Sequence, residues 1–142
     1  MTQADKDLLL NDLCGRLPYG VKVKFGDSKP ALLTVIEHDE FGWQIGSEDE
    51  FGGMITIIDN IKPYLFPLSS MTEEQYNEMQ TISGKDCMEH MEIEKEWRNN
   101  SPFTHLPLYQ HRVIEFFHKY HFDYRGLIPM DLAIDATGLN IY

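Results

Sequence analysis

The sequence of 142 residues has only two cysteines, no export signal and no long apolar run. The first seven residues are polar and acidic, whereas an export signal has a basic start followed by an apolar stretch. Two distant cysteines, Cys14 and Cys87, in a chain without such a signal are typical of buried free thiols. The longest apolar runs, Leu8–Leu10 and Ile55–Ile58, are too short to cross a bilayer. These absences predict a cytoplasmic protein without a membrane partner.

Basic residues are also scarce. The chain has 12 lysines and arginines against 23 aspartates and glutamates, a formal net charge of −11. A phosphate backbone repels such a chain, so we expect no direct binding to nucleic acid. Hydrophobic residues nevertheless make up 42% and aromatic residues 12% of the chain, which is enough to fill a core.

Catalytic motifs are the third absence. Cys14, Cys87 and the pair Ser69–Ser70 lack the surroundings of a catalytic nucleophile. The pair Gly52–Gly53 lacks the lysine and the following helix of a phosphate-binding loop. We therefore expect no catalytic residue and no cofactor, and a non-enzymatic protein is favoured over an enzyme.

The hydrophobic pattern of residues 1–70 predicts a helix followed by a small β unit. Thr2 is suited to cap the helix, and glycine and proline end it after Leu13 and Cys14. The period of the pattern then changes to two, which is typical of strands. Short strands joined by turns predict an antiparallel, five-stranded, barrel-like sheet, in which Pro63 restricts the last strand to an edge or an end. The expected strands are Val21–Phe25, Ala31–Glu37, Trp43–Ile45, Met54–Ile58 and Ile61–Phe66.

Residues 71–142 have a helical pattern instead. Thr72 and Gln75 fit a capping box for a helix that ends near Ser83. A second helix is expected over Lys85–Arg98, and a third over Pro107–His121 with an apolar stripe. The fold class is therefore α+β: a leading helix, a small antiparallel five-stranded barrel-like sheet and a helical C-terminal half, with both halves sharing one core.

Histidines are concentrated near the end of the third helix. Helical geometry places His111 and His118 opposite the apolar stripe, in solvent. Only His118 and His121, three residues apart, could bind one metal ion, with Asp123 as a third ligand. These three are weak candidates for a metal site. A small metal-dependent enzyme is accordingly the second alternative function.

Two further features bear on partners. Tyr124 and Arg125 could form a recognition pair, since tyrosine and arginine are frequent at interface hot spots, or they could tie the tail to the β unit by an internal hydrogen bond. Acidic stretches could imitate nucleic acid and inhibit a basic protein, or they could simply be solvated surface. The acidic stretches are Glu37–Glu40, Glu48–Glu50 and Asp86–Glu96.

Four blocks of the sequence resemble an uncharacterised family of small acidic proteins from gut bacteria of the Bacteroides group and their phages or mobile elements. The blocks are Leu13–Val21, Lys62–Gln75, Phe122–Ile128 and Leu132–Tyr142. The resemblance implies a bacterial or phage cytoplasm and a mobile-element setting. It implies no activity and no catalytic residue.

Together these observations favour a non-enzymatic protein-interaction module, hypothetically an accessory protein of a phage or mobile element, with another protein as its partner. An acidic nucleic-acid mimic that inhibits a basic protein is the first alternative.

Overall fold

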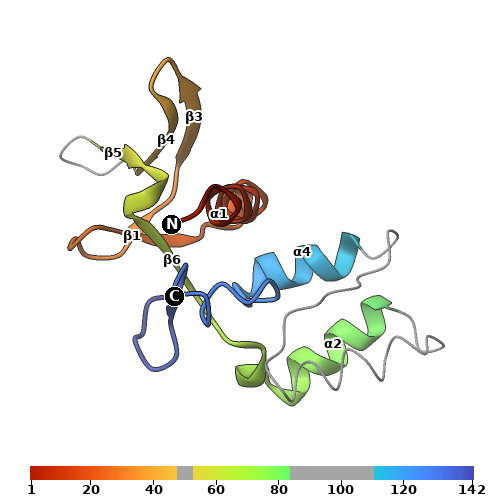
Figure 1. Cartoon of the computed structure of the whole chain (residues 1–142). Coiled ribbons are helices and arrows are strands. Elements are labelled where there is room, and N and C mark those ends of the chain that lie inside the picture. Colours follow the sequence, from red (N-terminus) through yellow and green to blue (C-terminus); the bar gives the residue numbers. More distant parts are fainter. Residues whose placement is uncertain (48–52, 84–110) are drawn as a thin grey trace.

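The computed structural model of the chain describes residues 1–47, 53–83 and 111–142, and within these ranges the fold is mixed α and β. The helices are α1 (Gln3–Arg16), α2 (Glu73–Ser83) and α4 (His111–Lys119). Figure 1 shows α2 and α4 side by side, away from the strands β3 to β5. Three short 3₁₀ helices connect other elements: η1 (Leu17–Tyr19), η2 (Ile58–Asn60) and η3 (Leu68–Ser70).

Two sheets form from the described residues. The four-stranded sheet has the order β2-β1-β6-β7, with β6 antiparallel to β1 and parallel to β7. The three-stranded sheet has the order β3-β4-β5 and is antiparallel throughout. The strands are β1 (Lys22–Phe25), β2 (Ala31–Leu32), β3 (Val35–Asp39), β4 (Gly42–Ser47), β5 (Met54–Ile57), β6 (Ile61–Leu65) and β7 (Ile134–Asp135).

This arrangement confirms the α+β class and corrects the expected five-stranded barrel-like sheet. The segment expected as one strand, Ala31–Glu37, divides between the two sheets. The backbone N–H of Leu33 donates to Val21 O beside β1, whereas the N–H of Thr34 donates to Gly46 O on β4. Because neighbouring residues bond to different strands, the chain passes from one sheet to the other at this point.

The position of β6 is a second correction. β6 contains Pro63 and lies between β1 and β7, although proline predicted an edge or an end. Proline is accommodated because β7 pairs only with Tyr64 and Leu65, so β6 has a neighbour at Pro63 only on the β1 side. The pairing with β7 joins strands far apart in sequence, and no local pattern indicates it.

Both expected helix starts within the described residues are confirmed. The side chain of Thr2 accepts from the N–H of Asp5, and Asp5 accepts from the N–H of Thr2, which forms a capping box at α1. Thr72 and Gln75 form the same reciprocal pair at the start of α2. The expected helix over Lys85–Arg98 lies outside the described residues.

The buried apolar residues form two clusters. One lies between α1 and the sheets and includes Leu9, Leu13 and Val23, together with Leu127 from the tail. The other lies between α2 and α4, where the expected stripe of Val113, Phe116 and Phe117 is buried. Residues of the tail that follow α4 therefore complete the first cluster.

Two expectations about exposure were wrong. His118 is 7% exposed and therefore buried, while His111 is exposed as expected. Cys14 is an exposed free thiol, and Cys87 lies outside the described residues. His118 is buried because its ring packs against Gly15 of α1, where a β-carbon would lie 2.5 Å from Cε1.

Candidate functional site

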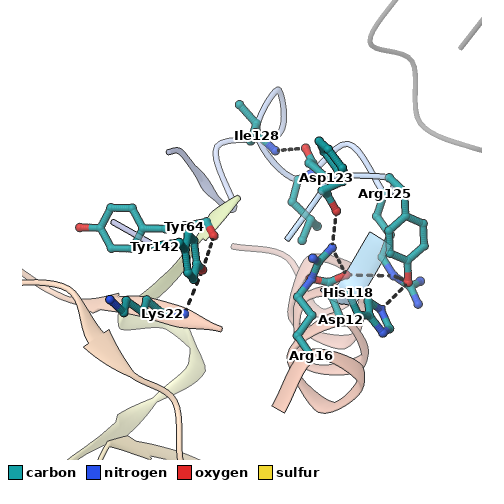
Figure 2. Close-up of polar contacts among 12 residues, drawn as sticks. Asp12, Arg16, Lys22, Tyr64, His118, Asp123, Arg125, Ile128 and Tyr142 are labelled. Atoms are coloured by element: carbon teal, nitrogen blue, oxygen red, sulfur yellow. Dashed lines mark hydrogen bonds and ion pairs between the residues drawn. The ribbon is translucent and has the colours of Figure 1, made fainter. Parts of the chain in front are cut away.

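A buried group of charged side chains connects α1 to the chain after α4. Asp12 and Arg16 are one helical turn apart on α1, and both are fully buried. Arg16 Nε donates to Asp12 Oδ2 over 2.6 Å, and Arg16 Nη2 donates to the backbone oxygen of Phe122 over 2.8 Å. Figure 2 shows this guanidinium between the carboxylate and the tail. The arginine therefore bridges segments 106 residues apart.

Tyr124 and Arg125, the expected recognition pair, belong to the same group. Arg125 Nε lies 3.2 Å from Asp12 Oδ1 and donates to the hydroxyl of Tyr124 over 3.0 Å. Tyr124 is 4% exposed, and its ring stacks on Phe117. Burial raises the pKa of the Tyr124 hydroxyl, which therefore stays protonated at neutral pH. These contacts join the tail to α1 and α4 rather than to the β unit, and the recognition role of the pair stays a prediction.

His118 completes the group as a neutral ring. Its Nε2 lies 3.0 Å from the hydroxyl of Tyr124. Burial, and then the positive charge of Arg16, lower the pKa of His118 from 6.5 to about 4. A β-carbon at Gly15 would lie 2.5 Å from His118 Cε1, so only glycine at that position leaves room for the ring.

The other two metal candidates, His121 and Asp123, have their contacts outside this group of side chains. The Asp123 carboxylate accepts hydrogen bonds of 2.8 Å from the backbone N–H groups of Leu127 and Ile128. Burial raises its pKa despite these bonds, which act in the opposite direction. His121 stacks on Tyr142, with ring centroids 3.9 Å apart. Among the described residues there is no group of three or more potential metal ligands.

These contacts describe a structural clamp. The opposite charges of Asp12 and Arg16 are buried together on α1, and their further polar partners, Phe122 O and Arg125, come from the chain after α4. Because Asp12 and Arg16 are fully buried, a substrate cannot contact their charged groups. The rings of His118 and His121, with pKa values of about 4, are neutral at pH 7. Part of the clamp has a local signal in the sequence, namely an aspartate and an arginine four residues apart on one helix.

The surface has two features that the sequence analysis missed. The three-stranded sheet exposes large apolar side chains. The hydrophobic pattern predicts strands for these residues but does not show which face of the sheet is exposed. A pocket of about 490 Å³ lies between the ends of α4 and the tail, beside His121 and Tyr142. The residues of the pocket come from segments far apart in the sequence, and no motif relates them.

Comparison with known proteins adds no relative. No protein-family model matches the chain, and neither a curated protein nor a solved structure matches it. In the described parts of the chain, no helix is both long and apolar enough to span a membrane. The function must therefore be argued from the geometry of the described residues.

Proposed function

We propose that this protein is a non-enzymatic protein-interaction module of the cytoplasm, an accessory protein of a phage or mobile element. Its partner is a protein that adds an extended apolar segment to the edge of the three-stranded sheet at β5. Two properties of this sheet support the proposal: the apolar side chains that it exposes, and the open edge of β5.

The exposed apolar side chains are the observation that carries the proposal. Phe41 is 80% exposed, Ile55 61%, and Ile57 45%. Trp43 and Met54 on the same sheet are 42% and 39% exposed. Scattered single apolar residues are ordinary on a protein surface, but a group of this size on one small sheet is typical of an interaction site.

The pairing register places these side chains on both faces of the sheet. Ile55 and Ile57 alternate with Thr56 and therefore share one face, where Ile55 lies against Gly46 of β4. Met54 is opposite Ser47, which puts it on the other face, the face of Trp43. A partner strand beside β5 would thus find apolar side chains above and below its backbone.

β5 itself is an edge that lacks the usual protection. Its outer side pairs with no strand among the described residues. Natural edge strands are commonly protected by charged residues, proline or a bulge, but the sequence Met54–Ile57 has neither charge nor proline. Exposed backbone groups together with apolar side chains are the elements of recognition by strand addition.

The alternative functions have less support. Of the acidic stretches behind the nucleic-acid mimic, Glu37–Glu40 is exposed, whereas Glu48–Glu50 and Asp86–Glu96 lie outside the described residues. The proposed metal ligands His118 and Asp123 are engaged with Tyr124 and with backbone N–H groups. Neither alternative has an observation that favours it over strand addition.

The proposal can be tested by affinity capture from a bacterial lysate treated with nuclease, at low and at high salt. The bait is compared with the Ile55→Lys variant, which places a charge at the exposed edge. The Met130→Lys variant is the matched control, because Met130 is 46% exposed and lies outside the sheet. Both variants change the net charge of the chain equally.

We expect a protein that stays bound at high salt to the parent chain and to Met130→Lys, and is lost with Ile55→Lys. The same captured proteins with Ile55→Lys as with the parent would contradict strand addition at β5. A basic protein that is released by salt, regardless of either variant, would favour the nucleic-acid mimic instead.

A further inference from the structure

The pocket beside His121 and Tyr142 is separate from the three-stranded sheet and from the buried clamp. Its volume is about 490 Å³, which lies within the range of small-molecule sites in proteins. It is bounded by the end of β6, the start of α2, the end of α4 and the tail. Five of its lining residues are aromatic: Phe66, Tyr120, His121, Phe122 and Tyr142.

The aromatic floor of the pocket is held in place by backbone contacts. Phe66 and Phe122 form a parallel β-bridge. The N–H of Phe66 donates to His121 O over 2.9 Å, and the N–H of Asp123 donates to Phe66 O over 2.8 Å. On the other side, the hydroxyl of Tyr142 donates to Tyr64 O over 2.8 Å. Rings that are fixed in this way form a preorganised surface for a flat ligand.

The charge of the pocket differs from that of the protein. The chain has 23 acidic residues, yet among the described residues no aspartate or glutamate lines this pocket, and Lys119 does. The Lys119 ammonium bonds to Glu78 Oε1 and to the hydroxyl of Tyr120, and its third hydrogen remains for another acceptor. Among the described residues that line the pocket, Lys119 is the one with a charged side chain. An anionic ligand is therefore better matched to this pocket than a cationic one.

The ring of His121 is the most buried of the polar side chains in the lining. His121 is 8% exposed, and its Nδ1 is buried without a hydrogen-bond partner among the described residues. Buried polar atoms in proteins nearly always have a partner. The φ of +58° at His121 belongs to the end of α4, where the N–H of His121 donates to His118 O and the N–H of Phe122 donates to Phe117 O. Because Nδ1 is buried, a ligand in the pocket contacts the more exposed lining residues, such as Lys119 and Tyr142, rather than this atom.

We propose that this pocket binds a planar aromatic molecule that carries a carboxylate. The flat ring lies against the aromatic floor, and the carboxylate accepts a hydrogen bond from the Lys119 ammonium. Hydroxyl groups of Ser70 and Thr137 in the lining can bond to further polar substituents. The proposal does not depend on strand addition at β5, because the two surfaces share no residue.

Titration of the full chain with 2-naphthoate, followed by calorimetry and by amide NMR shifts, tests the proposal. 2-Naphthylmethanol and 2-naphthylmethylamine are matched neutral and cationic probes. We expect 2-naphthoate to bind the most tightly of the three, with shifts at Thr72, Thr137 and Gly138. Because these shifts are read on the parent protein, the site is located without any variant. Absence of binding, equal binding of the three probes, or shifts confined to other residues would overturn the proposal.

Two variants with matched controls test the contacts. Thr137 is exposed, so Thr137→Trp fills the pocket without entering the core and should weaken 2-naphthoate by about tenfold or more. Thr81→Trp, at an exposed threonine outside the pocket, should leave the affinity unchanged. Lys119→Gln should weaken the binding of 2-naphthoate by about two- to fivefold and leave the binding of 2-naphthylmethanol unchanged. Lys62→Gln should change the binding of neither probe. Equal affinities for the parent and Thr137→Trp would refute the site.

Discussion

Replacing Arg16 by methionine should destabilise the protein strongly, because the change removes one partner of a buried ion pair. Methionine keeps the apolar stem of the arginine, so the main loss is the guanidinium. Asp12, which is fully buried, would then retain Arg125 as its one basic partner among the described residues, with Nε 3.2 Å from Oδ1. The backbone oxygen of Phe122 would lose the bond from Arg16 Nη2 and keep the one from the N–H of Tyr124.

The size of the effect follows from these contacts. Breaking a buried pair by removing one partner lowers the free energy of unfolding by about 3–5 kcal/mol. We expect the lower end of this range, about 3 kcal/mol, because Arg125 still faces Asp12 and because Arg16 Nη1 has no partner among the described residues. Such a loss is a large share of the roughly 5–15 kcal/mol that stabilises an ordinary domain.

Urea denaturation of four variants measures the effect, and the single variant Asp12→Leu completes a double-mutant cycle for positions 12 and 16. Arg16→Met is compared with the double variant Asp12→Leu/Arg16→Met, which leaves no unpaired aspartate and should recover part of the loss. Lys6→Met removes a half-exposed ion pair with Asp59 and should change the free energy of unfolding by no more than about 1 kcal/mol. If Arg16→Met costs no more than Lys6→Met, or if the effects at positions 12 and 16 simply add, the clamp does not act as a coupled unit.

Three further predictions concern the surroundings of the clamp. The pKa values of His118 and His121 are about 4 in the folded protein and 6.5 in the unfolded chain. Between pH 6.5 and pH 4 the unfolded chain therefore binds more protons than the folded protein, and the free energy of unfolding should fall over this range by at most about 3 kcal/mol for each ring. NMR should find both rings neutral at pH 5.5, and titration of either near pH 6.5 would contradict this. Gly15→Ala should lower the free energy of unfolding by about 1–3 kcal/mol, because the β-carbon meets His118, and the melting temperature should fall with it. Helix propensity alone predicts an increase in both quantities. Tyr142→Phe keeps the stacking on His121 but removes the hydrogen bond to Tyr64 O, so urea denaturation should detect a loss of about 1 kcal/mol, and an unchanged midpoint would refute that role.

Local signals in the sequence were sufficient for the starts of α1 and α2 and for the buried face of α4, but not for β7 or for the division of Ala31–Glu37 into β2 and β3. The capping residues Thr2 and Thr72 indicate where α1 and α2 begin, and the stripe that contains Val113 and Phe117 indicates the buried face of α4. These features depend on residues within a few positions of each other. The same local signals could not place the strands in sheets, because Leu33 and Thr34 select different partners through long-range backbone bonds.

The candidate site shows the same limit. The histidines near the end of α4 are clustered in the sequence, but helical periodicity predicts that the His118 side chain lies in solvent. The ring is buried because α1 offers the space at Gly15 and Tyr124 offers a hydrogen bond, and both come from other segments. The pocket beside His121 likewise depends on the tail, whose Tyr142 folds back onto the sheet through Tyr64. Periodicity contains no information about such contacts.

The most direct test of the central claim is photocrosslinking with a benzophenone amino acid placed at position 55, compared with the same amino acid at position 130. Both sites are exposed and apolar, but only Ile55 lies on the edge strand β5. The proposal predicts a discrete crosslink to one protein from position 55 and none from position 130, in cells that express the protein. No crosslink at position 55, or the same products from both positions, would contradict recognition through the three-stranded sheet.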